Sequence, residues 1–588
     1  MNRCNWPLRW LGLLLACANL ALAEIVLHPQ VEALPVAWQG PFVRTREGAI
    51  VGAYERGILV SRDEGASWEQ RAIFAGSQFV SRPERALLAT REGVLVHVFL
   101  NESERVFRWD DAKGGPQAGC RLPVYVVRSL DGGATWEAPR QLQDGWCGAV
   151  RQMIQLKNGR ILLVCQRAEA NPGRHVSIVY ASDDQGVTWQ ASAPIDLADQ
   201  GNYAVPSEGL RGSTHGGAVE GTVYERASGE LRLVLRVPHG YFLELQSRDG
   251  LKWTNPIPSV LEASDSPGMI IRLASGRLML AWNRYVDPVQ RKGRREELSV
   301  AFSGNDGITW SVPQIVAVSR TPAGEREGKF WISYPYLFEA TPGEIWLSTM
   351  QGNLRAKVRE AVFASPVDRP LDGRERRILL LGDSITRGAR VGVVPSETFG
   401  ARLQASLDAA GLRVQVHNVG IGSERTDLAL ERIERDVLSQ RPAVVAVMYG
   451  TNDSWVDKGR DVSRLTEAQY EANLRQLVSR MMQRGIRVVL MTPPCFGEEN
   501  PRNGLGEDPN LRLRRYAALA RKVSVETHVP LVDHFAEWEV RQKRGDRLQS
   551  LTTDGCHPNA RGHAVLADAL LPIVREALQN ASGAALVK

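Results

Sequence analysis

The chain has 588 residues and a formal net charge of +6. This length is too great for one ordinary hydrophobic core, so it predicts two or three domains. The 72 basic and 66 acidic residues are interspersed along the chain. Because no basic block of the kind that binds nucleic acid occurs, we expect no nucleic-acid partner.

The N-terminus is typical of an export signal. Two arginines precede the short apolar stretch Leu11–Leu22, and the sequence ALA at Ala21–Ala23 is typical of a cleavage site. We therefore expect residues 1–23 to be a signal peptide, which makes the protein periplasmic or secreted. A lipid anchor at Cys17 is the alternative, because LLAC resembles a bacterial lipobox. No later segment predicts a transmembrane span.

Five copies of a polar turn divide the first half of the chain. Three of them have the pattern Ser-x-Asp-x-Gly-x-Ser/Thr-Trp, the fourth is shortened and the fifth reads SGNDGITW; the five end at Trp68, Trp136, Trp189, Trp253 and Trp310. Each copy follows a glycine turn and an apolar, β-rich run, and a sixth such unit starts at Pro342–Gln351. Repeats of about 50 residues with several strands each predict an all-β propeller.

The residue types of this turn have a structural explanation. Ser and Asp side chains hold a turn by hydrogen bonds to nearby backbone N–H groups, Gly supplies a positive φ, and Trp packs between strands. A calcium loop is the alternative, but the acidic spacing of an EF-hand and its final Glu are missing. We therefore interpret the turns as structural.

These turns resemble the Asp boxes, or BNR repeats, of sialidase-like propellers. The resemblance implies six blades within residues 24–368. Sialidases grip a carboxylate with three arginines and attack with a Tyr that is backed by Glu. By this resemblance, the candidate glycan-binding residues of the propeller are Glu220, Arg236, Arg284, Arg295 and Tyr334.

Two parts of the sialidase pattern do not match. The Arg-Ile-Pro phrase of the first strand is absent, since Arg44 lies too close to the following glycine turn. Sialidases also use a separate Asp as the catalytic acid/base, and we find no Asp in a phrase that resembles the one around that residue. We therefore expect the propeller to bind a glycan and not to cleave a sialoside, and we keep a bifunctional enzyme as an alternative.

The second half has a different pattern. A proline- and charge-rich stretch that includes residues 369–376 is expected to link the propeller to a second domain, residues 377–588. Short apolar runs there alternate with helix-like segments, which predicts an α/β fold of three layers, flavodoxin-like, with a parallel sheet. The expected strands are Arg377–Gly382, Arg413–Asn418, Pro442–Gly450, Ile486–Thr492 and Val529–His534.

Polar phrases follow these strands, where open α/β sheets carry their sites. They are GDSITRG (Gly382–Gly388), NVGIGSERT (Asn418–Thr426), GTND (Gly450–Asp453) and, before the last helix, DGCH (Asp554–His557). This set predicts acyl transfer: Ser384 as nucleophile, His557 as base and Asp554 as the group that orients the imidazole. The expected oxyanion donors are the N–H of Ser384, an N–H of the second phrase and the Asn452 amide.

The four phrases resemble, in content and order, those of SGNH/GDSL hydrolases. The oxyanion glycine of that family falls on Ser423, with Gly422 just before it; a backbone N–H is all that the role requires. The resemblance implies a carboxylic ester hydrolase of the Ser-His-Asp type that needs no cofactor or metal. We expect Asp383 and Asp453 to fix turns.

The expected function is that of a carbohydrate O-acetylesterase acting on an acylated glycan or a small ester. Two alternatives remain: a bifunctional exo-sialidase and sialate O-acetylesterase, and a lipase or arylesterase with a non-catalytic propeller. The sequence leaves the acyl length, the glycan and the oligomeric state open.

The cysteine count leaves disulfides open. Export permits them, and five cysteines follow the signal peptide. Cys495 and Cys556 are expected at the same edge of the sheet, so we expect them to form a disulfide.

Overall fold

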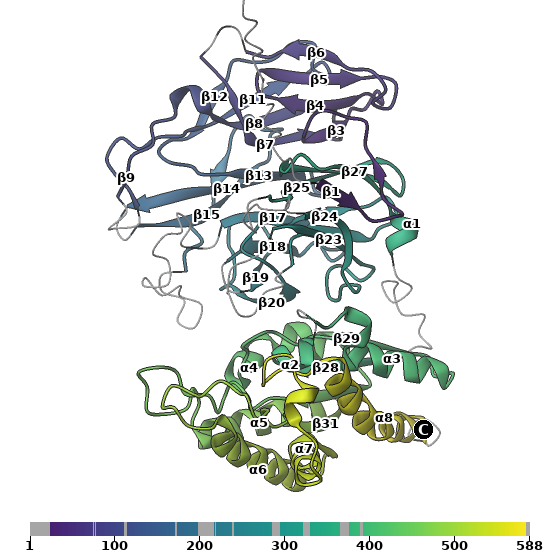
Figure 1. Cartoon of the computed structure of the whole chain (residues 1–588). Helices are drawn as coiled ribbons and strands as arrows, with labels where there is room; N and C mark the ends of the chain where they lie inside the picture. Colours follow the sequence, from purple (N-terminus) through teal and green to yellow (C-terminus); the bar gives the residue numbers. More distant parts are fainter. Residues whose placement is uncertain are drawn as a thin grey trace, which may run out of the picture.

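The computed structural model describes residues 24–583, apart from residues 75, 77, 111–114, 171–172, 198–216, 218, 238–239, 285–294, 321–329, 365–375 and 389–391. It consists of a β-propeller followed by an α/β domain (Figure 1). The predicted signal peptide with Cys17, and nearly all of the predicted linker, lie outside the described residues. No helix among the described residues has the length and apolar character needed to cross a bilayer.

The propeller has six antiparallel sheets, which confirms the predicted architecture. Blade one consists of β3 (Phe42–Arg44), β4 (Ile50–Tyr54), β5 (Gly57–Ser61) and β6 (Glu69–Ala72). Blade two consists of β7 (Ser81–Ala89), β8 (Leu95–Asn101), β11 (Val124–Ser129) and β12 (Arg140–Gln143). Blade three consists of β13 (Val150–Gln155), β14 (Ile161–Ala170), β15 (Gly173–Ser182) and β16 (Gln190–Ala191). A 3-10 turn (Glu102–Glu104) and a small ribbon of β9 (Trp109–Asp110) and β10 (Gly115–Pro116) lie between β8 and β11.

Blades four to six follow the same plan. Blade four consists of β17 (Val219–Glu225), β18 (Leu231–Arg236), β19 (Tyr241–Ser247) and β20 (Ile257–Glu262). Blade five contains β21 (Met269–Arg272), β22 (Leu278–Trp282), β23 (Glu297–Ser303) and β24 (Gln314–Arg320). Blade six contains β25 (Ser333–Thr341), β26 (Glu344–Gln351) and β27 (Arg355–Arg359). The short helix α1 (Glu360–Phe363) ends the propeller part of the described chain.

Strands from the beginning of the described chain complete the last two blades. β1 (Glu24–Leu27) pairs antiparallel with β24, and β2 (Glu32–Ala33) pairs with β27. The outer strand of blade six, β2, therefore precedes blade one in the sequence, and its other three strands, β25 to β27, follow blade five. This pairing closes the ring of blades, so the exposed strand edge that an open ring would leave is covered.

The polar turns have the predicted hydrogen bonds. In the first one, Ser61 Oγ donates to Asp63 Oδ1 (2.8 Å) and accepts from Gly65 N (2.8 Å), and Ser67 N donates to Asp63 Oδ1 (2.9 Å). Asn305 takes the place of the aspartate in the fifth copy and accepts from Thr309 N at 3.0 Å. The neutral Asn305 amide accepts the bond that the aspartate accepts in the first copy, which fits a structural role for the turn.

The propeller cores lie between neighbouring blades. One cluster joins Leu162 and Val164 of blade three to Leu233 and Leu235 of blade four, and all four are buried. Complete burial of a side chain of this size contributes about 1.5–3 kcal/mol. Alternating apolar residues on each strand thus hold adjacent blades together.

The α/β domain has one sheet of five parallel strands, as predicted. Its spatial order is β29-β28-β30-β31-β32. The strands are β28 (Arg376–Gly382), β29 (Val414–Asn418), β30 (Val444–Met448), β31 (Arg487–Thr492) and β32 (Leu531–Asp533). This order is the flavodoxin-like one, in which the chain reverses direction beside the first strand.

Helices cover both faces of this sheet (Figure 1). Ile378 and Leu380 of β28 pack toward α3 (Phe399–Ala409) and α8 (Ala560–Gly583). The alternate residues Leu379 and Leu381 pack on the other face, against α4 (Thr426–Asp436), α5 (Glu467–Met482) and α6 (Pro509–Thr527). The remaining helical segments are α2 (Ser384–Arg387), α7 (His534–Lys543) and the 3-10 turns Pro395–Glu397, Leu438–Gln440 and Leu548–Leu551.

Candidate active site

Ser384 lies at the carboxyl edge of the sheet, on the tight turn from β28 into α2. Asp383 caps α2, because its Oδ1 accepts a hydrogen bond from Ile385 N at 2.9 Å. Gly382 ends the strand where an added Cβ would lie 2.6 Å from Met448 O. This contact is closer than any side chain tolerates, so the glycine lets β30 approach the turn that presents Ser384.

Ser384, His557 and Asp554 are connected by hydrogen bonds. Ser384 Oγ lies 2.8 Å from His557 Nε2, and His557 Nδ1 lies 3.0 Å from Asp554 Oδ2. Asp554 Oδ1 also accepts from His557 N at 2.8 Å and Cys556 N at 3.1 Å, which fixes the loop before α8. The pattern fits the tautomer in which Nδ1–H donates to the carboxylate and Nε2 accepts from the hydroxyl.

The predicted oxyanion residues follow the two neighbouring strands. Asn452 follows β30, and its Nδ2 donates to Asp383 Oδ2 at 3.2 Å. Gly422 and Ser423 belong to the loop after β29. A Cβ on Gly422 would lie 2.6 Å from Arg387 Nη1. Ser423 is exposed and has a left-handed φ of +63°, a conformation that few residues other than glycine adopt.

Two buried aspartates hold these loops. Asp453 accepts from Thr426 N (2.9 Å), Thr426 Oγ1 (2.7 Å) and Gly450 N (3.1 Å), which ties the second polar phrase to the third. Burial raises the pKa of Asp383 to about 7 and that of Asp453 to about 6. As expected from the sequence, both side chains fix turns.

Three of the five predicted propeller residues meet at the ring centre. Tyr334 Oη donates to Glu220 Oε1 at 2.8 Å, and Arg236 Nη1 contacts Glu220 Oε2 at 2.5 Å and Tyr334 Oη at 3.1 Å. Arg236 Nε also pairs with Asp265 Oδ1 at 2.7 Å. Burial, together with the charge of Glu220, raises the pKa of Tyr334 to about 12. The guanidinium of Arg295 lies 5.5 Å from the centre of the Tyr334 ring.

The remaining arginines differ in their placement. Arg284 lies on the segment after β22 and pairs with Glu297 Oε1 at 2.7 Å; among the described residues, no hydrogen bond or ion pair joins it to Arg236 or Tyr334. Arg44 pairs with Glu64 of the first polar turn, at 2.6 Å. It therefore serves the outer turn, which agrees with our exclusion of Arg44 from a carboxylate-binding triad.

Glu220 and Tyr334 share an unusual backbone conformation. Both have left-handed φ values, +51° and +62°. Such strain in residues other than glycine costs about 1–3 kcal/mol and is concentrated at functional sites. This observation marks the ring centre as a candidate binding site.

A group of charged residues that no sequence motif signals lies behind residues 419–424, the loop that carries the predicted oxyanion donors Gly422 and Ser423 and is called the oxyanion loop below. Arg432 of α4 donates from Nε to Glu424 Oε1 (2.6 Å) and from Nη2 to Val419 O (2.7 Å). Tyr449 Oη donates to Glu424 Oε2 at 2.5 Å. The available signal was weak: Glu424 directly follows Ser423, but the arginine that it binds lies eight residues away and belongs to no motif.

The expected disulfide between Cys495 and Cys556 is wrong, since neither residue forms one in the structure. The two side chains pack in the same apolar cluster, as their predicted positions imply. Cys495 Sγ instead lies 3.4 Å from Phe535 O. Across the described ranges, no group of three or more His, Cys, Asp or Glu side chains is placed to hold a metal ion.

Two family models match the chain. The GDSL-like lipase/acylhydrolase family matches residues 380–565, and the BNR repeat-like domain matches residues 32–347. The first match covers the three candidate triad residues, and the second covers the propeller blades through most of blade six.

Several known proteins are similar to about a third of the chain. An acetylxylan esterase of Geobacillus stearothermophilus is 32% identical over 216 residues, which cover 34% of this chain and 94% of that protein. An uncharacterized lipoprotein of Bacillus subtilis is 28% identical over 179 residues, which cover 27% of this chain and 72% of that protein. A solved mutant of an acetyl-xylooligosaccharide esterase from Geobacillus has 27% identity and a TM-score of 0.30, with 34% of this chain and 94% of the other covered.

These matches cover both architectures that the structure contains. The chain belongs to the BNR repeat-like family through its propeller and carries a GDSL-like acylhydrolase domain after it, which makes it a carboxylic ester hydrolase.

Proposed function

We propose that the protein is an exported carbohydrate O-acetylesterase whose catalytic triad is Ser384, His557 and Asp554. The observation that carries the proposal is the unbroken pair of hydrogen bonds from Ser384 Oγ through the His557 ring to Asp554. A serine on a strand-to-helix turn, with an imidazole oriented by a carboxylate, is the arrangement that serine acyl transfer requires.

The reaction has two halves. Ser384 Oγ attacks the ester carbonyl while His557 Nε2 accepts the hydroxyl proton, and Asp554 stabilises the imidazolium that forms. The alcohol then leaves with the proton from His557 and an acyl-enzyme remains. Water attacks that acyl group, His557 accepts a proton from the water, and the acid is released as Ser384 regains its proton.

The negative charge of both tetrahedral intermediates needs donors. We assign these to the N–H of Ser384, an N–H of Gly422 or Ser423, and Nδ2 of Asn452. Asn452 already donates one hydrogen to Asp383, and a primary amide has a second hydrogen to offer. Removal of one such donor typically costs about 10²–10³ in kcat.

The proposed substrate is a glycan that carries acetyl esters. Two observations support it: one similar protein is named an acetylxylan esterase, and the propeller centre offers Tyr334, Glu220 and Arg236 as polar groups for a sugar. A lipase or arylesterase is the alternative. Acid release from p-nitrophenyl acetate, long-chain p-nitrophenyl esters and acetylated glycans distinguishes the two. Acetate release from the glycan, abolished by Ser384→Ala, supports the proposal, whereas turnover of long-chain esters alone contradicts it.

A second candidate function is sialoside cleavage by the propeller, in a bifunctional enzyme. It is favoured by one observation, the hydrogen-bonded group of Tyr334, Glu220 and Arg236. Release of a fluorophore from a sialoside tests it. We expect no efficient release, because no acid/base Asp was found and Arg44 serves an outer turn. Efficient release that Tyr334→Phe abolishes would establish the second activity.

Export is part of the proposal. We expect the mature protein to begin at Glu24, after the ALA sequence. N-terminal sequencing of protein from the native host tests this start. A lipid-modified Cys17 at the N-terminus would replace simple secretion by membrane anchoring, and similarity to a lipoprotein of Bacillus subtilis supports including this outcome.

A further inference from the structure

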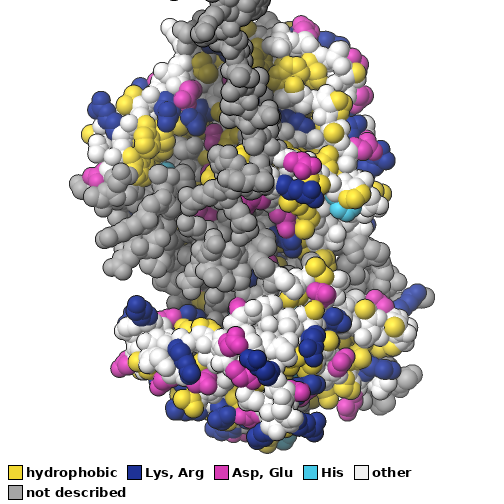
Figure 2. Space-filling view, viewed as in Figure 1, with side chains coloured by type: hydrophobic (Ala, Val, Ile, Leu, Met, Phe, Trp, Pro, Cys, Tyr) yellow, Lys and Arg dark blue, Asp and Glu magenta, His cyan; other side chains and the backbone are white. Residues whose placement is uncertain are grey.

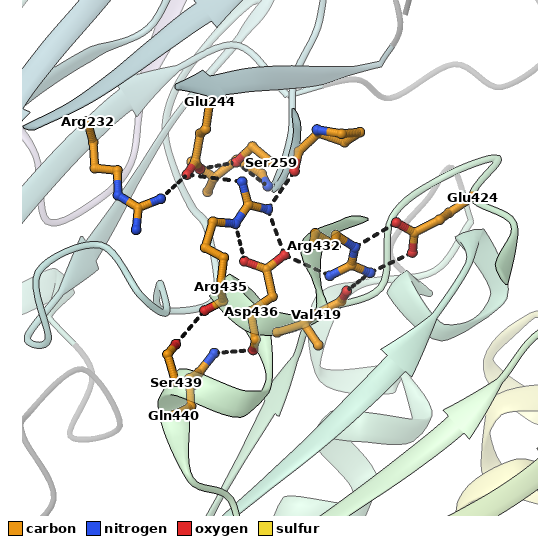
Figure 3. Close-up of polar contacts among 12 residues, drawn as sticks. Arg232, Glu244, Ser259, Val419, Glu424, Arg432, Arg435, Asp436, Ser439 and Gln440 are labelled. Carbon is orange, nitrogen blue, oxygen red and sulfur yellow. Dashed lines mark hydrogen bonds and ion pairs between the residues drawn. The ribbon is translucent and has the colours of Figure 1, made fainter. Parts of the chain in front are cut away.

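The last turn of α4 packs against the outer strands of blade four. Arg435 Nη1 lies 3.5 Å from Glu244 Oε2 of β19, and Arg435 Nη2 donates to Pro258 O at 2.6 Å (Figure 3). Apolar side chains cross the same boundary: Leu428 of α4 belongs to a propeller cluster, and Val260 of β20 packs against the core of the α/β domain. The two parts of the chain therefore share a core at this contact.

The ion pairs at this contact form a continuous series. From the propeller inward, the alternating charges are those of Glu244, Arg435, Asp436, Arg432 and Glu424 (Figure 3). The side chains of Glu244, Arg435 and Asp436 are each 8% exposed, and those of Arg432 and Glu424 are 0% and 1% exposed. Buried charges are stable only when they are paired, so removal of one charge forces its neighbours to find new partners.

The inner end of the series holds both ends of the oxyanion loop. Arg432 donates to Val419 O at the start of the loop and to the Glu424 carboxylate at its end. Glu424 follows Ser423, whose left-handed φ of +63° requires that the loop be held in place. The position of the Arg432 guanidinium therefore sets where the N–H groups of Gly422 and Ser423 lie.

A second contact reaches the same loop from its other side. Arg387, the last residue of the one-turn helix that begins at Ser384, pairs through Nη2 with Glu262 Oε1 of β20 at 3.3 Å. Its Nη1 lies 2.6 Å from the position of a Cβ on Gly422. The guanidinium therefore forms the support against which Gly422 packs, and a propeller carboxylate holds that guanidinium.

We propose that blade four of the propeller positions the oxyanion loop of the esterase, with Glu244 and Glu262 as positioning residues that act through Arg435, Arg432 and Arg387. The inference rests on the proposed function, because it assigns the oxyanion to the loop beside Ser384. It gives the propeller a role in the chemical step itself, in addition to any glycan that it binds.

The test uses Glu244→Gln and Glu262→Gln in the full chain, because each change keeps the shape and removes the charge. An oxyanion donor acts mainly in the transition state, so its displacement lowers kcat and leaves KM nearly unchanged. With p-nitrophenyl acetate we expect kcat to fall at least about tenfold in each variant, a part of the 10²–10³ that loss of a whole donor costs. Because the triad is untouched, the shape of the pH–rate profile stays the same.

Glu360→Gln is the matched control. Glu244 is buried, accepts a hydrogen bond from Ser259 Oγ at 2.6 Å and pairs with Arg435. Glu360 is also buried in the propeller, accepts a hydrogen bond from Ser275 Oγ at 2.6 Å and pairs with Arg277 at 3.0 Å. Its partners Ser275, Arg277 and Gly343 lie in blades five and six. We expect wild-type kcat for this variant. If Glu244→Gln does not fold, Ser259→Ala perturbs the same carboxylate more gently and takes its place.

Hydrogen exchange of the peptide that contains residues 419–424 gives a readout that needs no activity. Faster exchange in Glu244→Gln, but not in Glu360→Gln, supports the inference. If this change occurs while Ser384→Ala retains full esterase activity, the proposed function fails and the coupling stands. If activity depends on Ser384 while folded Glu244→Gln and Glu262→Gln keep wild-type kcat and wild-type exchange of the loop, the inference is overturned.

Discussion

In the proposed mechanism, Ser384 and His557 share one proton-transfer step, for which their Oγ and Nε2 atoms lie 2.8 Å apart. The hydroxyl is a weak nucleophile until the imidazole accepts its proton, and the imidazole has no other role in the attack. The Asp554 carboxylate, which also accepts two backbone N–H groups, is held by its own loop and keeps Nδ1 as the donor.

We therefore expect the effects of Ser384→Ala and His557→Ala not to add. Each single change should lower kcat for p-nitrophenyl acetate by about 10³–10⁶, and the double variant should be little slower than either one. Steady-state kinetics on variants shown by circular dichroism to be folded makes the comparison. Losses that multiply would show that the two side chains act in separate steps.

Asp383 gives the stability of the α/β domain a pH dependence. Burial raises its pKa to about 7, whereas an aspartate in an unfolded chain has a pKa near 3.9. Between about pH 4 and 7 the folded state therefore binds a proton that the unfolded state has released, so this contribution to stability decreases as pH rises.

Asp383→Asn should remove this dependence. Relative to wild type, we expect the variant to gain roughly 1–4 kcal/mol in free energy of unfolding between pH 5 and pH 8. A weakened hydrogen bond to Asn452 adds an offset that does not change with pH. Denaturant unfolding of both proteins at the two pH values gives the difference, and parallel curves would contradict a raised pKa.

At the scale of elements, glycine has two separable uses in the blades. Gly65 of the first polar turn has φ +86°, and an added Cβ would lie 2.5 Å from the Trp346 ring of blade six. Gly93 of a blade-two hairpin has φ +96°, and nothing lies within 4 Å of such a Cβ. Gly65 therefore allows both the positive φ of the turn and the close approach of the Trp346 ring, whereas Gly93 allows only the positive φ.

Gly65→Ala should therefore destabilise the propeller more than Gly93→Ala. A left-handed alanine costs about 1–2 kcal/mol at either position, and the contact with Trp346 adds about 1–3 kcal/mol at Gly65. Thermal unfolding followed by tryptophan fluorescence compares the two variants. Equal losses of stability would mean that Trp346 moves aside without cost.

Much of both folds could be predicted because it is encoded in short local patterns. The polar turns revealed the blades, and apolar runs that alternate with helices revealed the parallel sheet. The four polar phrases each follow a strand or precede a helix, so the edge of the sheet where Ser384 and His557 meet could be derived from topology alone.

The rest depends on contacts between distant residues. Glu244 and Arg435 lie 191 positions apart, and neither belongs to a repeated phrase, so nothing local signals their pairing. Arg236 ends β18 and Arg284 closely follows β22, but the partner of Arg284 is Glu297 of the adjacent strand β23. The predicted disulfide was wrong because proximity of Cys495 and Cys556 in the same cluster does not establish the geometry of a bond.

At the scale of the whole molecule, the propeller and the α/β domain meet through blade four, and charged side chains of both signs are interspersed on the face seen in Figure 2. The Tyr334 group lies at the ring centre and the Ser384 group in the other domain. We expect a polymeric substrate to contact both groups and a small ester to contact Ser384 alone.

Arg295→Ala should therefore affect only the polymer. We expect KM for an acetylated glycan to rise about tenfold, the equivalent of 1.4 kcal/mol, and kcat/KM for p-nitrophenyl acetate to stay at the wild-type value. Arg284→Ala is the control, since Arg284 pairs with Glu297. Unchanged KM for every acetylated glycan tested would contradict a positioning role for the ring centre.

The central claim is that Ser384 is the nucleophile of the esterase, and covalent labelling tests it most directly. The full chain is treated with a fluorophosphonate that forms an adduct with activated serines, then digested and analysed by mass spectrometry while residual hydrolysis of p-nitrophenyl acetate is followed. We predict one adduct, on the peptide that contains Ser384, formed in parallel with loss of activity, and neither adduct nor activity in folded Ser384→Ala. An adduct on another serine, or a folded Ser384→Ala variant with wild-type turnover, would contradict the account.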